Sequence, residues 1–203
     1  NVTCFGANNG IISVSGASGG YGTYEYSIDN GSTWQATGSF ANLAPGTYQV
    51  SIRDAANTAC VIDLDSTPGT TITQPAVLSA TVTPTNVTCF GANNGIISVS
   101  GASGGYGTYE YSIDNGSTWQ ATGSFANLAP GTYQVSIRDA ANTACVIDLD
   151  STPGTTITQP AVLSATVTPT NVTCFGANNG IISVSGASGG YGTYEYSIDN
   201  GST

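Results

Sequence analysis

The chain has 203 residues and a net charge of −10, because twelve Asp and Glu residues face two Arg, no Lys and no His. This balance argues against nucleic acid and anionic membrane surfaces as partners, since both are bound through Lys and Arg. The His and Lys that general bases and Schiff-base amines usually require are absent, so we expect no enzyme activity and no cofactor. No segment reaches the ~20 consecutive apolar residues of a membrane-spanning helix, and we expect no membrane insertion.

The dominant feature of the sequence is a long repeat. Residues 1–85 are identical to residues 86–170, and residues 171–203 repeat the first part once more. A period of 85 residues is the size of a small domain and is too long for a helical solenoid. We therefore expect a tandem array of whole domains, of which this sequence is a window.

Short apolar runs between Gly- and Pro-containing turns predict β-strands throughout each period. Asn30-Gly31, flanked by alternating apolar residues, is typical of a two-residue hairpin turn. The all-β elements that we expect in the first period are, in chain order, a strand at 10–16, a hairpin at 24–37, a strand at 43–54, closing strands at 60–66 and 70–75, and an extended strand at 77–90 that is kinked at Pro84.

Aromatic residues favour a sandwich architecture. Trp34, on the second strand of the hairpin, is a candidate core anchor. Tyr48 follows the Pro45-Gly46 turn at the start of a strand and resembles the tyrosine corner of immunoglobulin-like domains. We therefore predict tandem immunoglobulin-like or fibronectin type III-like β-sandwich modules with an 85-residue period. As an alternative to a core role, Tyr24, Tyr26, Trp34 and Tyr48 could form a platform on which sugars stack.

The extended strand at 77–90 shifts the expected domain boundary to Gln74-Pro75-Ala76. Residues 1–75 would then be a module that lacks its first strand, residues 76–160 a complete module, and residues 161–203 the N-terminal part of a third. The connection between modules is short and contains Pro, which favours a semi-rigid junction. We expect neighbouring identical modules to be the main partners of each module.

Each full period contains two widely spaced Cys residues, which indicates an oxidising compartment. Pairing inside each module would join Cys4 to Cys60 and Cys89 to Cys145, and the partner of Cys174 would then lie outside the sequence. Two alternatives stay open, because the thiols could be free and buried, or Cys60 could pair with Cys89 across a junction. CxxC pairs and His are absent, so we expect no zinc site.

We consider two further features as ligand sites: pairs of carboxylates and one Gly-rich segment. Asp63 and Asp65, with their copies Asp148 and Asp150, lie on one strand face and are weak candidates for calcium ligands. A solvated acidic face is the competing interpretation, because no Asp-x-Asp-x-Asp-Gly loop is present. The Gly-rich segment 15–22 is expected to be a loop, because no helix follows it and no Lys is available to reach a phosphate.

Several motifs occupy fixed places in the period: Cys4-Phe5-Gly6 with Asn9-Gly10, Gly19-Gly20, Tyr24-x-Tyr26-Ser27-Ile28-Asp29, Leu43-x-Pro45-Gly46-x-Tyr48, Asp54 with Cys60, and Ile72-Thr73-Gln74-Pro75. With these motifs the chain resembles the SprB-repeat family of Bacteroidota surface adhesins. The resemblance implies a very large, repetitive cell-surface protein without catalytic residues, exported by the type IX route and tied to gliding or adhesion. The segments 54–60 and 61–71 depart from the shorter pattern of the family in the last hairpin.

We therefore expect a non-catalytic stalk or filament segment of a giant extracellular surface adhesin. The alternative is a multivalent array of weak glycan-binding modules that act by avidity. Besides neighbouring modules, partners would be surface polysaccharide or other filament chains. By the same resemblance, Asp65-Ser66-Thr67 and its copy fit the O-glycosylation pattern of exported proteins in these bacteria, so Ser66 and Ser151 are candidate glycosylation sites.

Overall fold

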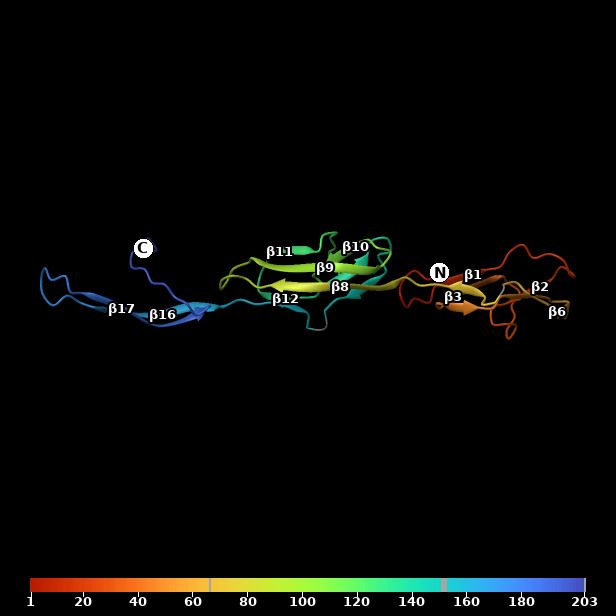
Figure 1. Ribbon diagram of the computed structural model, residues 1–203, viewed down its shortest axis with the longest axis horizontal. Helices are drawn as coiled ribbons and strands as arrows, with labels where there is room; N and C mark the ends of the chain where they lie inside the picture. Colours follow the sequence, from red (N-terminus) through yellow and green to blue (C-terminus); the bar gives the residue numbers. More distant parts are fainter. Residues whose placement is uncertain (66, 151–152, 203) are drawn as a thin grey trace. The chain divides into compact units, whose positions relative to one another are not determined.

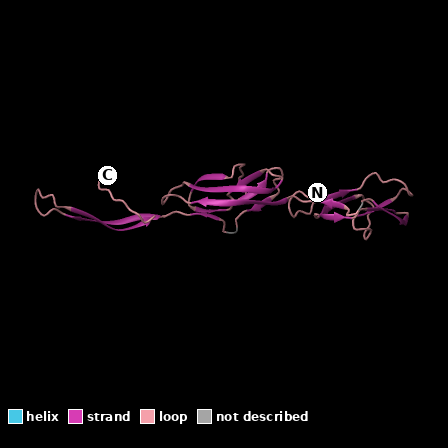
Figure 2. Cartoon of the chain, in the orientation of Figure 1, coloured by secondary structure: helices cyan, strands magenta, loops and turns pink. Residues whose placement is uncertain are grey.

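The computed structural model describes residues 1–65, 67–150 and 153–202 (Figure 1). Within these residues every regular element is a β-strand and none is a helix (Figure 2). The fold class is therefore all-β, as the apolar pattern predicts. The chain forms two compact units, which comprise Asn1–Thr81, Gly101–Tyr111 and Ser136–Leu149 in the first, and Val82–Ser100, Ser112–Val135 and Asp150–Thr203 in the second.

The strands between residues 10 and 72 all lie in the first unit and form small antiparallel sheets. β1 (Gly10–Ser13) pairs with β3 (Ser39–Leu43), and β4 (Gly46–Tyr48) pairs with β7 (Thr70–Ile72). β2 (Tyr24–Ser27), β5 (Ser51–Asp54) and β6 (Asn57–Asp63) form a third sheet with β5 in the middle.

The second copy repeats these pairings and adds a strand. β10 (Tyr109–Ser112), β13 (Ser136–Asp139) and β14 (Val146–Asp148) form one sheet, and β12 (Gly131–Tyr133) pairs with β15 (Thr155–Ile157). β9 (Gly95–Gly105) lies between β11 (Ser124–Leu128) and the additional strand β8 (Ala76–Thr85). β16 (Ala161–Thr170) and β17 (Ile181–Gly190) form an antiparallel pair in the third copy.

The extra strand changes the length of its neighbour. β9 has 11 residues and β1 has 4, although the two segments have the same sequence. β9 is hydrogen-bonded on both sides, whereas β1 has β3 as its one partner strand among the residues that the structure describes. Since a strand persists where its backbone N–H and C=O groups find partners, the second partner explains the longer strand. The Gly-rich segment 15–22 is a loop in the first copy, as expected, whereas residues 100–105 of its copy belong to β9.

The same four positions of the period form the apolar core in both full copies. Val2, Ile12, Val50 and Ile72 are buried in the first unit, with Phe40, Leu43 and Tyr48 packed against them. The corresponding residues of the second unit are Val87, Ile97, Val135 and Ile157, which are at most 1 % exposed. Full burial of such side chains stabilises the fold by about 1.5–3 kcal/mol each.

The strand predicted at 43–54 is divided between two sheets. β4 pairs with β7, whereas β5 pairs with β2 and β6, so the chain changes sheet at Gln49 and Val50. At this point the N–H of Val50 donates to Oδ1 of Asp65 at 2.9 Å instead of to a neighbouring strand. A side-chain acceptor therefore satisfies the backbone where the ladder is interrupted.

The hairpin predicted at 24–37 forms only in part. Asn30 and Gly31 both have positive φ, at 58° and 79°, as the predicted turn requires. The return segment, however, is joined to β2 only by the two backbone hydrogen bonds between Tyr26 and Gln35, at 2.8 and 3.0 Å. The turn at Asn30-Gly31 therefore forms, closed by the N–H of Ser32 donating to the carbonyl of Asp29 at 3.3 Å, but the strand pairing begins only at Tyr26 and Gln35, so the hairpin loop is longer than the two residues predicted.

Side chains hold this longer loop in shape. The hydroxyl of Ser27 accepts the N–H of Gly31 at 2.9 Å, and Oδ1 of Asp29 accepts the N–H of Thr33 at 2.8 Å. The hydroxyl of Thr33 also donates to Oδ2 of Asp29 at 2.6 Å. The hydrogen bonds that the Asp29 carboxylate accepts, first those from Thr33 and then that from the Ser27 hydroxyl, lower the pKa of Asp29 to about 2.

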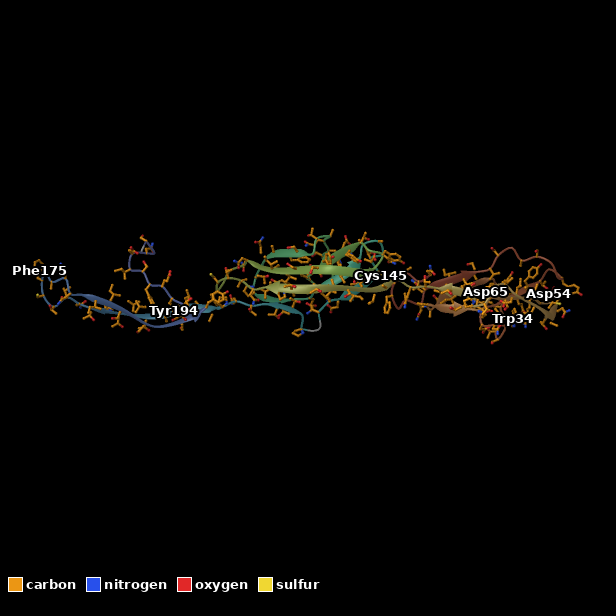
Figure 3. The ribbon with its side chains drawn as sticks, viewed as in Figure 1. Trp34, Asp54, Asp65, Cys145, Phe175 and Tyr194 are labelled. Atoms are coloured by element: carbon orange, nitrogen blue, oxygen red, sulfur yellow. A yellow bond between two sulfur atoms is a disulfide. The ribbon has the colours of Figure 1, made fainter. Side chains whose placement is uncertain are left out.

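Trp34 is half-buried and is not the core anchor that we predicted (Figure 3). The guanidinium carbon of Arg53 lies 4.5 Å from the centre of its ring, a cation–π geometry. Arg53 also forms an ion pair with Glu25, with 2.6 Å between Nη2 and Oε2. Trp34 therefore covers a polar face of the β2–β5–β6 sheet.

Candidate functional site: a disulfide between two copies of the repeat

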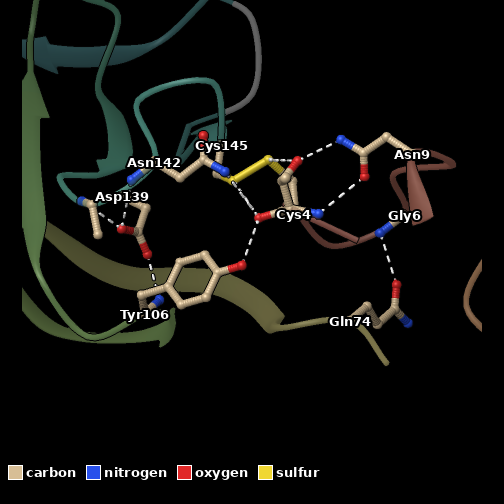
Figure 4. Close-up of a disulfide and its surroundings, with 10 residues drawn as sticks. Cys4, Gly6, Asn9, Gln74, Tyr106, Asp139, Asn142 and Cys145 are labelled. Carbon is tan, nitrogen blue, oxygen red and sulfur yellow. Dashed lines mark hydrogen bonds between the residues drawn. A yellow bond between two sulfur atoms is a disulfide. The ribbon is translucent and has the colours of Figure 1, made fainter. Parts of the chain in front are cut away.

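Cys4 of the first copy forms a disulfide with Cys145 of the second copy (Figure 4). Among the described residues, Cys60, Cys89 and Cys174 are free thiols and are exposed. The predicted pairs Cys4–Cys60 and Cys89–Cys145 are therefore wrong. The alternative pairing of Cys60 with Cys89 within the chain is not present either.

Placement of the two cysteines within the first copy explains the correction. Gly6, beside Cys4, donates its N–H to Oε1 of Gln74 at 2.8 Å, so the Cys4 loop lies where the chain leaves the first copy. Cys60 is on β6, which lies at the other end of that copy (Figure 1). Because a disulfide joins only cysteines whose Cα atoms lie within about 7 Å, the two residues of one copy cannot pair without rearrangement.

A small hydrogen-bond network fixes the loop that carries Cys4. The N–H of Thr3 donates to Oδ1 of Asn9 at 3.0 Å, and Nδ2 of Asn9 donates to the hydroxyl of Thr3 at 2.6 Å. The N–H of Val2 donates to the carbonyl of Thr73 at 3.0 Å. The sulfur atom of Cys4 is thus held on a closed loop that is joined to the end of its own copy.

On the other side, Asp139 organises the segment that carries Cys145. Its carboxylate is fully buried, and its Oδ1 accepts the N–H of Ala141 at 2.8 Å and that of Asn142 at 3.2 Å. Its Oδ2 accepts the N–H of Tyr106. Asp139 therefore links the Gly-rich end of β9 to the turn before Cys145, an arrangement that we did not predict from the sequence.

The carbonyl of Thr3 is the shared acceptor at the junction. The hydroxyl of Tyr106 and Nδ2 of Asn142 both donate to it, each at 3.2 Å. Cys145 itself is 7 % exposed. In addition to the peptide chain, the disulfide and these two hydrogen bonds to the residue that precedes Cys4 therefore join the two copies.

Apolar residues surround the disulfide. A cavity of about 60 Å³ is lined, besides Cys4 and Cys145, by Phe5, Pro75, Ala76, Leu78, Gly105, Val146 and Ile147. Leu78 on β8 is 6 % exposed. Gly105 has φ of +55°, and a Cβ at this position would come within 2.9 Å of Leu78. A Cβ here would come still closer to Oδ2 of Asp139, so this position within the Gly-rich segment requires Gly for the buried carboxylate and β8 to pack closely.

The segment that precedes the second cysteine has one sequence and two conformations. In the first copy Asn57–Asp63 is a continuous strand, and Cys60 lies on it as an exposed residue. In the second copy the strand starts only at Val146, because the N–H of Cys145 donates to the carbonyl of Asn142 at 2.9 Å and closes a turn. The turn places Cys145 against the loop of Cys4.

The calcium candidates are placed as follows. Asp63 and Asp148 are exposed on β6 and β14. Oδ2 of Asp65 accepts the N–H of Thr70 at 2.7 Å, in addition to the bond from Val50, and Asp150 makes the corresponding bonds in the second copy. Within the described ranges, no three His, Cys, Asp or Glu side chains gather in a way that could hold a metal ion.

Backbone contacts also set the ionisation of Asp65. Burial favours the neutral form of the carboxyl, but hydrogen bonds from Thr70 and Val50 favour the charged form more strongly, so that its pKa is lowered. Asp65 and Asp150 thus join two strands through their carboxylates. The glycosylation candidates Ser66 and Ser151 lie outside the described residues.

One family matches the chain in three places. The sequence profile of the SprB repeat matches residues 1–33, 81–118 and 166–203, which together are more than half of the chain. The chain belongs to the SprB-repeat family. Its members are associated with cell-surface proteins, and the second and third matched segments begin one 85-residue period apart.

No curated protein and no solved structure is detectably similar to the chain. In the part of the SprB-repeat chain that the structure describes, no helix has the length and apolar character of a membrane span.

Proposed function

We propose that this SprB-repeat chain is a non-catalytic stalk or filament segment of a giant extracellular surface adhesin. The observation that carries the proposal is the Cys4–Cys145 disulfide, which joins consecutive copies in addition to the peptide chain. Such a bond forms and persists in an oxidising compartment, which agrees with export to the cell surface by the type IX route. A load-bearing segment benefits from identical copies and from covalent junctions, whereas catalysis needs neither.

The modules are, in this proposal, immunoglobulin-like sandwiches with an 85-residue period. The hydroxyl of Tyr48 donates to the carbonyl of Ala44 at 2.9 Å, and Tyr133 makes the same bond to Ala129. This contact from a tyrosine to the backbone a few residues upstream has the form of a tyrosine corner. The change of sheet at Gln49 and Val50 also agrees with a two-layer architecture.

The disulfide has a direct mechanical consequence for a stalk. When the chain is pulled at its two ends, the force passes from Cys4 to Cys145 through the disulfide, and residues 5–144 carry no load. Reduction would release these residues, which add about 480 Å of extended chain at ~3.4 Å per residue. The disulfide thus protects most of two copies against mechanical unfolding.

Single-molecule force spectroscopy tests this proposal on the whole chain. The oxidised chain should extend only through the residues outside the disulfide, and dithiothreitol should add about 480 Å to the contour length. The variant Cys60→Ser is the matched control and should behave like the unchanged chain in both conditions. Equal contour lengths with and without dithiothreitol would remove the mechanical basis of the proposal.

A multivalent glycan-binding array is the second candidate function. A cavity of about 500 Å³ is lined by the aromatic residues Tyr26, Trp34, Phe40 and Tyr48 together with Ile28, Asp29, Thr33 and Gln35. Aromatic faces with nearby polar groups are the usual components of a sugar site. Glycan arrays probed with the whole chain distinguish the two functions, since a stalk binds no glycan and a lectin array loses binding in the variant Trp34→Ala.

A further inference from the structure

The cavity beside Trp34 is walled by four aromatic rings and one carboxylate. Tyr26, Trp34, Phe40 and Tyr48 line it together with Asp29, and its volume is about 500 Å³. Tyr26 is 9 % exposed, and the other three rings are half-buried. The rings are therefore packed against the rest of the copy and still border an open space, which we call the Trp34 cavity.

The second copy of the repeat carries the same wall. The corresponding residues, 85 positions on, are Asp114, Trp119, Phe125 and Tyr133. Each has the same burial as its counterpart in the first copy. In both copies the threonine four positions after the aspartate donates its hydroxyl to the carboxylate at 2.6 Å. The second copy keeps this arrangement although β8 adds a strand there, so the wall belongs to the repeat itself.

The hydrogen-bond donors of the wall already have partners within the chain. Nε1 of Trp34 and the hydroxyl of Tyr48 each donate to a backbone carbonyl at 2.9 Å. Nε2 of Gln35 donates to the carbonyls of Thr37 and Ser39, at 2.7 and 3.0 Å. A ligand that binds through many hydroxyl groups would have to break these bonds, which costs free energy. The cavity therefore favours a ligand that needs few hydrogen bonds.

The Asp29 carboxylate brings a negative charge to the cavity. The chain has two basic side chains, Arg53 and Arg138, and each forms an ion pair with a glutamate. Among the described residues, no basic side chain is therefore left to pair with Asp29. Hydrogen bonds, first those from Thr33, lower the pKa of Asp29 to about 2, so the carboxylate is ionised at neutral pH. This charge favours a cationic ligand, which the net charge of −10 also attracts.

Trp34 already makes the kind of contact that such a ligand requires. The guanidinium carbon of Arg53 lies 4.5 Å from the centre of its ring, although Arg53 does not line the cavity. Aromatic rings attract cations through their negative faces, and several rings around one site bind quaternary ammonium groups. Such a group carries a positive charge and no hydrogen-bond donor. It therefore needs only what the cavity offers, namely aromatic rings and a carboxylate.

We propose that the Trp34 cavity, and its copy around Trp119, bind a quaternary ammonium cation of the choline type. The methyl groups lie against the aromatic rings, and the positive charge faces the carboxylate of Asp29 or Asp114. The volume of about 500 Å³ is in the range of about 300–1,000 Å³ that is usual for small-molecule sites. The proposal does not depend on the stalk function, and it gives this cavity a class of ligand other than a neutral glycan.

Titration of the whole chain with choline, followed by tryptophan fluorescence, tests the proposal. The chain has two tryptophans, Trp34 and Trp119, and one belongs to each cavity, so binding should change their emission directly. The matched control ligand is the neutral isostere of choline, in which a tert-butyl group replaces the trimethylammonium group. It should bind about tenfold more weakly, because it lacks the cation. Equal affinities for the two compounds, no response to choline, or binding of methyl glucoside in place of choline would overturn the proposal.

A pair of variants separates the charge of the cavity from the charge of the whole chain. Asp29→Asn and Asp63→Asn each remove one carboxylate, but Asp63 is exposed on β6 and does not line the cavity. Calorimetry should find two equivalent choline sites in the unchanged chain. Asp29→Asn should weaken one of them about tenfold and leave the other unchanged, whereas Asp63→Asn should keep both. Equal effects of the two variants would contradict the site. The comparison of choline with its isostere uses the unchanged chain and stays decisive if Asp29→Asn disturbs its loop.

Vesicles distinguish two sources of the quaternary ammonium group. Phosphatidylcholine carries the group on a lipid, whereas the ammonium of phosphatidylethanolamine has hydrogen-bond donors in place of the methyl groups. Sedimentation of the chain with phosphatidylcholine vesicles alone, competed by free choline, would identify the lipid headgroup as the source. Binding of free choline without such sedimentation would identify a soluble choline compound. Both results support the site, whereas equal sedimentation with the two kinds of vesicle and no competition by choline would contradict it.

Discussion

The Cα atoms of Cys4 and Cys145 lie 5.4 Å apart, although 141 positions separate the two residues in the sequence. The separation is within the range that a disulfide needs. Each cysteine is positioned by its own copy, Cys4 by the loop closed through Asn9 and Cys145 by the turn anchored on Asp139. The bond therefore joins segments from two copies of the repeat within one compact unit.

Loss of this disulfide should destabilise the chain. We expect Cys145→Ser to lower the free energy of unfolding by about 2–4 kcal/mol, because the unfolded chain regains the freedom that the cross-link removes. Urea unfolding followed by Trp fluorescence measures the effect. Cys60→Ser makes the same change at the same position of the repeat, where the thiol is exposed and free, and should alter stability by no more than about 0.5 kcal/mol. Equal losses in the two variants would contradict the pairing.

The carboxylate of Asp150 should be a structural element. It accepts the N–H groups of Val135 at 3.0 Å and Thr155 at 2.7 Å. We expect Asp150→Ala to cost about 1–3 kcal/mol, because two partly buried donors lose their acceptor. Asp148→Ala, at an exposed position two residues earlier, is the control and should be near neutral. Thermal unfolding of the two variants checks the difference.

Calcium should leave the stability of the chain unchanged. The oxygens of Asp65 and Asp150 that could bind the ion are already used by backbone N–H groups. Thermal unfolding in calcium and in a chelator measures this directly. A rise of the unfolding temperature in calcium that Asp63→Asn abolishes would instead support the ion site.

The hydroxyl of Thr118 should make the largest single contribution to the low pKa of Asp114. Hydrogen bonds, first that from the side chain of Thr118, lower the pKa of this carboxyl to about 2. Thr118→Val should raise this pKa toward the ordinary value of about 3.9. Asp29, whose partner Thr33 is unchanged, is an internal control with a pKa of about 2. Titration of the two carboxyls by NMR separates them, and equal shifts would contradict the assignment.

The low pKa values of Asp29 and Asp114 predict that the folded chain loses stability in acid. Their pKa is lower in the folded than in the unfolded chain, so their contribution to stability is present above about pH 4 and is lost as the pH falls toward 2. Unfolding midpoints measured between pH 5 and pH 2 should therefore decrease. Thr118→Val should flatten part of this decrease.

Local patterns in the sequence predict much of the fold. The alternation of Ile12 and Val14, the turn at Pro45-Gly46 and the long run after Ala76 place β1, β4 and β8 close to where the structure has them. The positive φ of Asn30 and Gly31 was also predictable, because few other residue pairs adopt it. These features depend on short-range chemistry alone.

Features that depend on the neighbouring copy were not predictable in this way. The segment before Cys60 is a strand, and the identical segment before Cys145 is a turn. No local pattern can assign two structures to one sequence, so the contact with Cys4 decides between them. Trp34 likewise covers Arg53 instead of entering the core, because the small core of the first copy is filled by Val2, Ile12, Val50 and Ile72.

Non-reducing tryptic mapping of the Cys174→Ser variant tests the Cys4–Cys145 bond most directly. Cleavage after Arg53 and Arg138 places Cys4 in peptide 1–53, Cys60 and Cys89 in peptide 54–138, and Cys145 in peptide 139–203. The structure predicts a disulfide-linked pair of peptides 1–53 and 139–203 that reductant separates. A pair of peptides 1–53 and 54–138 would show that Cys4 is bound to Cys60 or Cys89 and would contradict the junction.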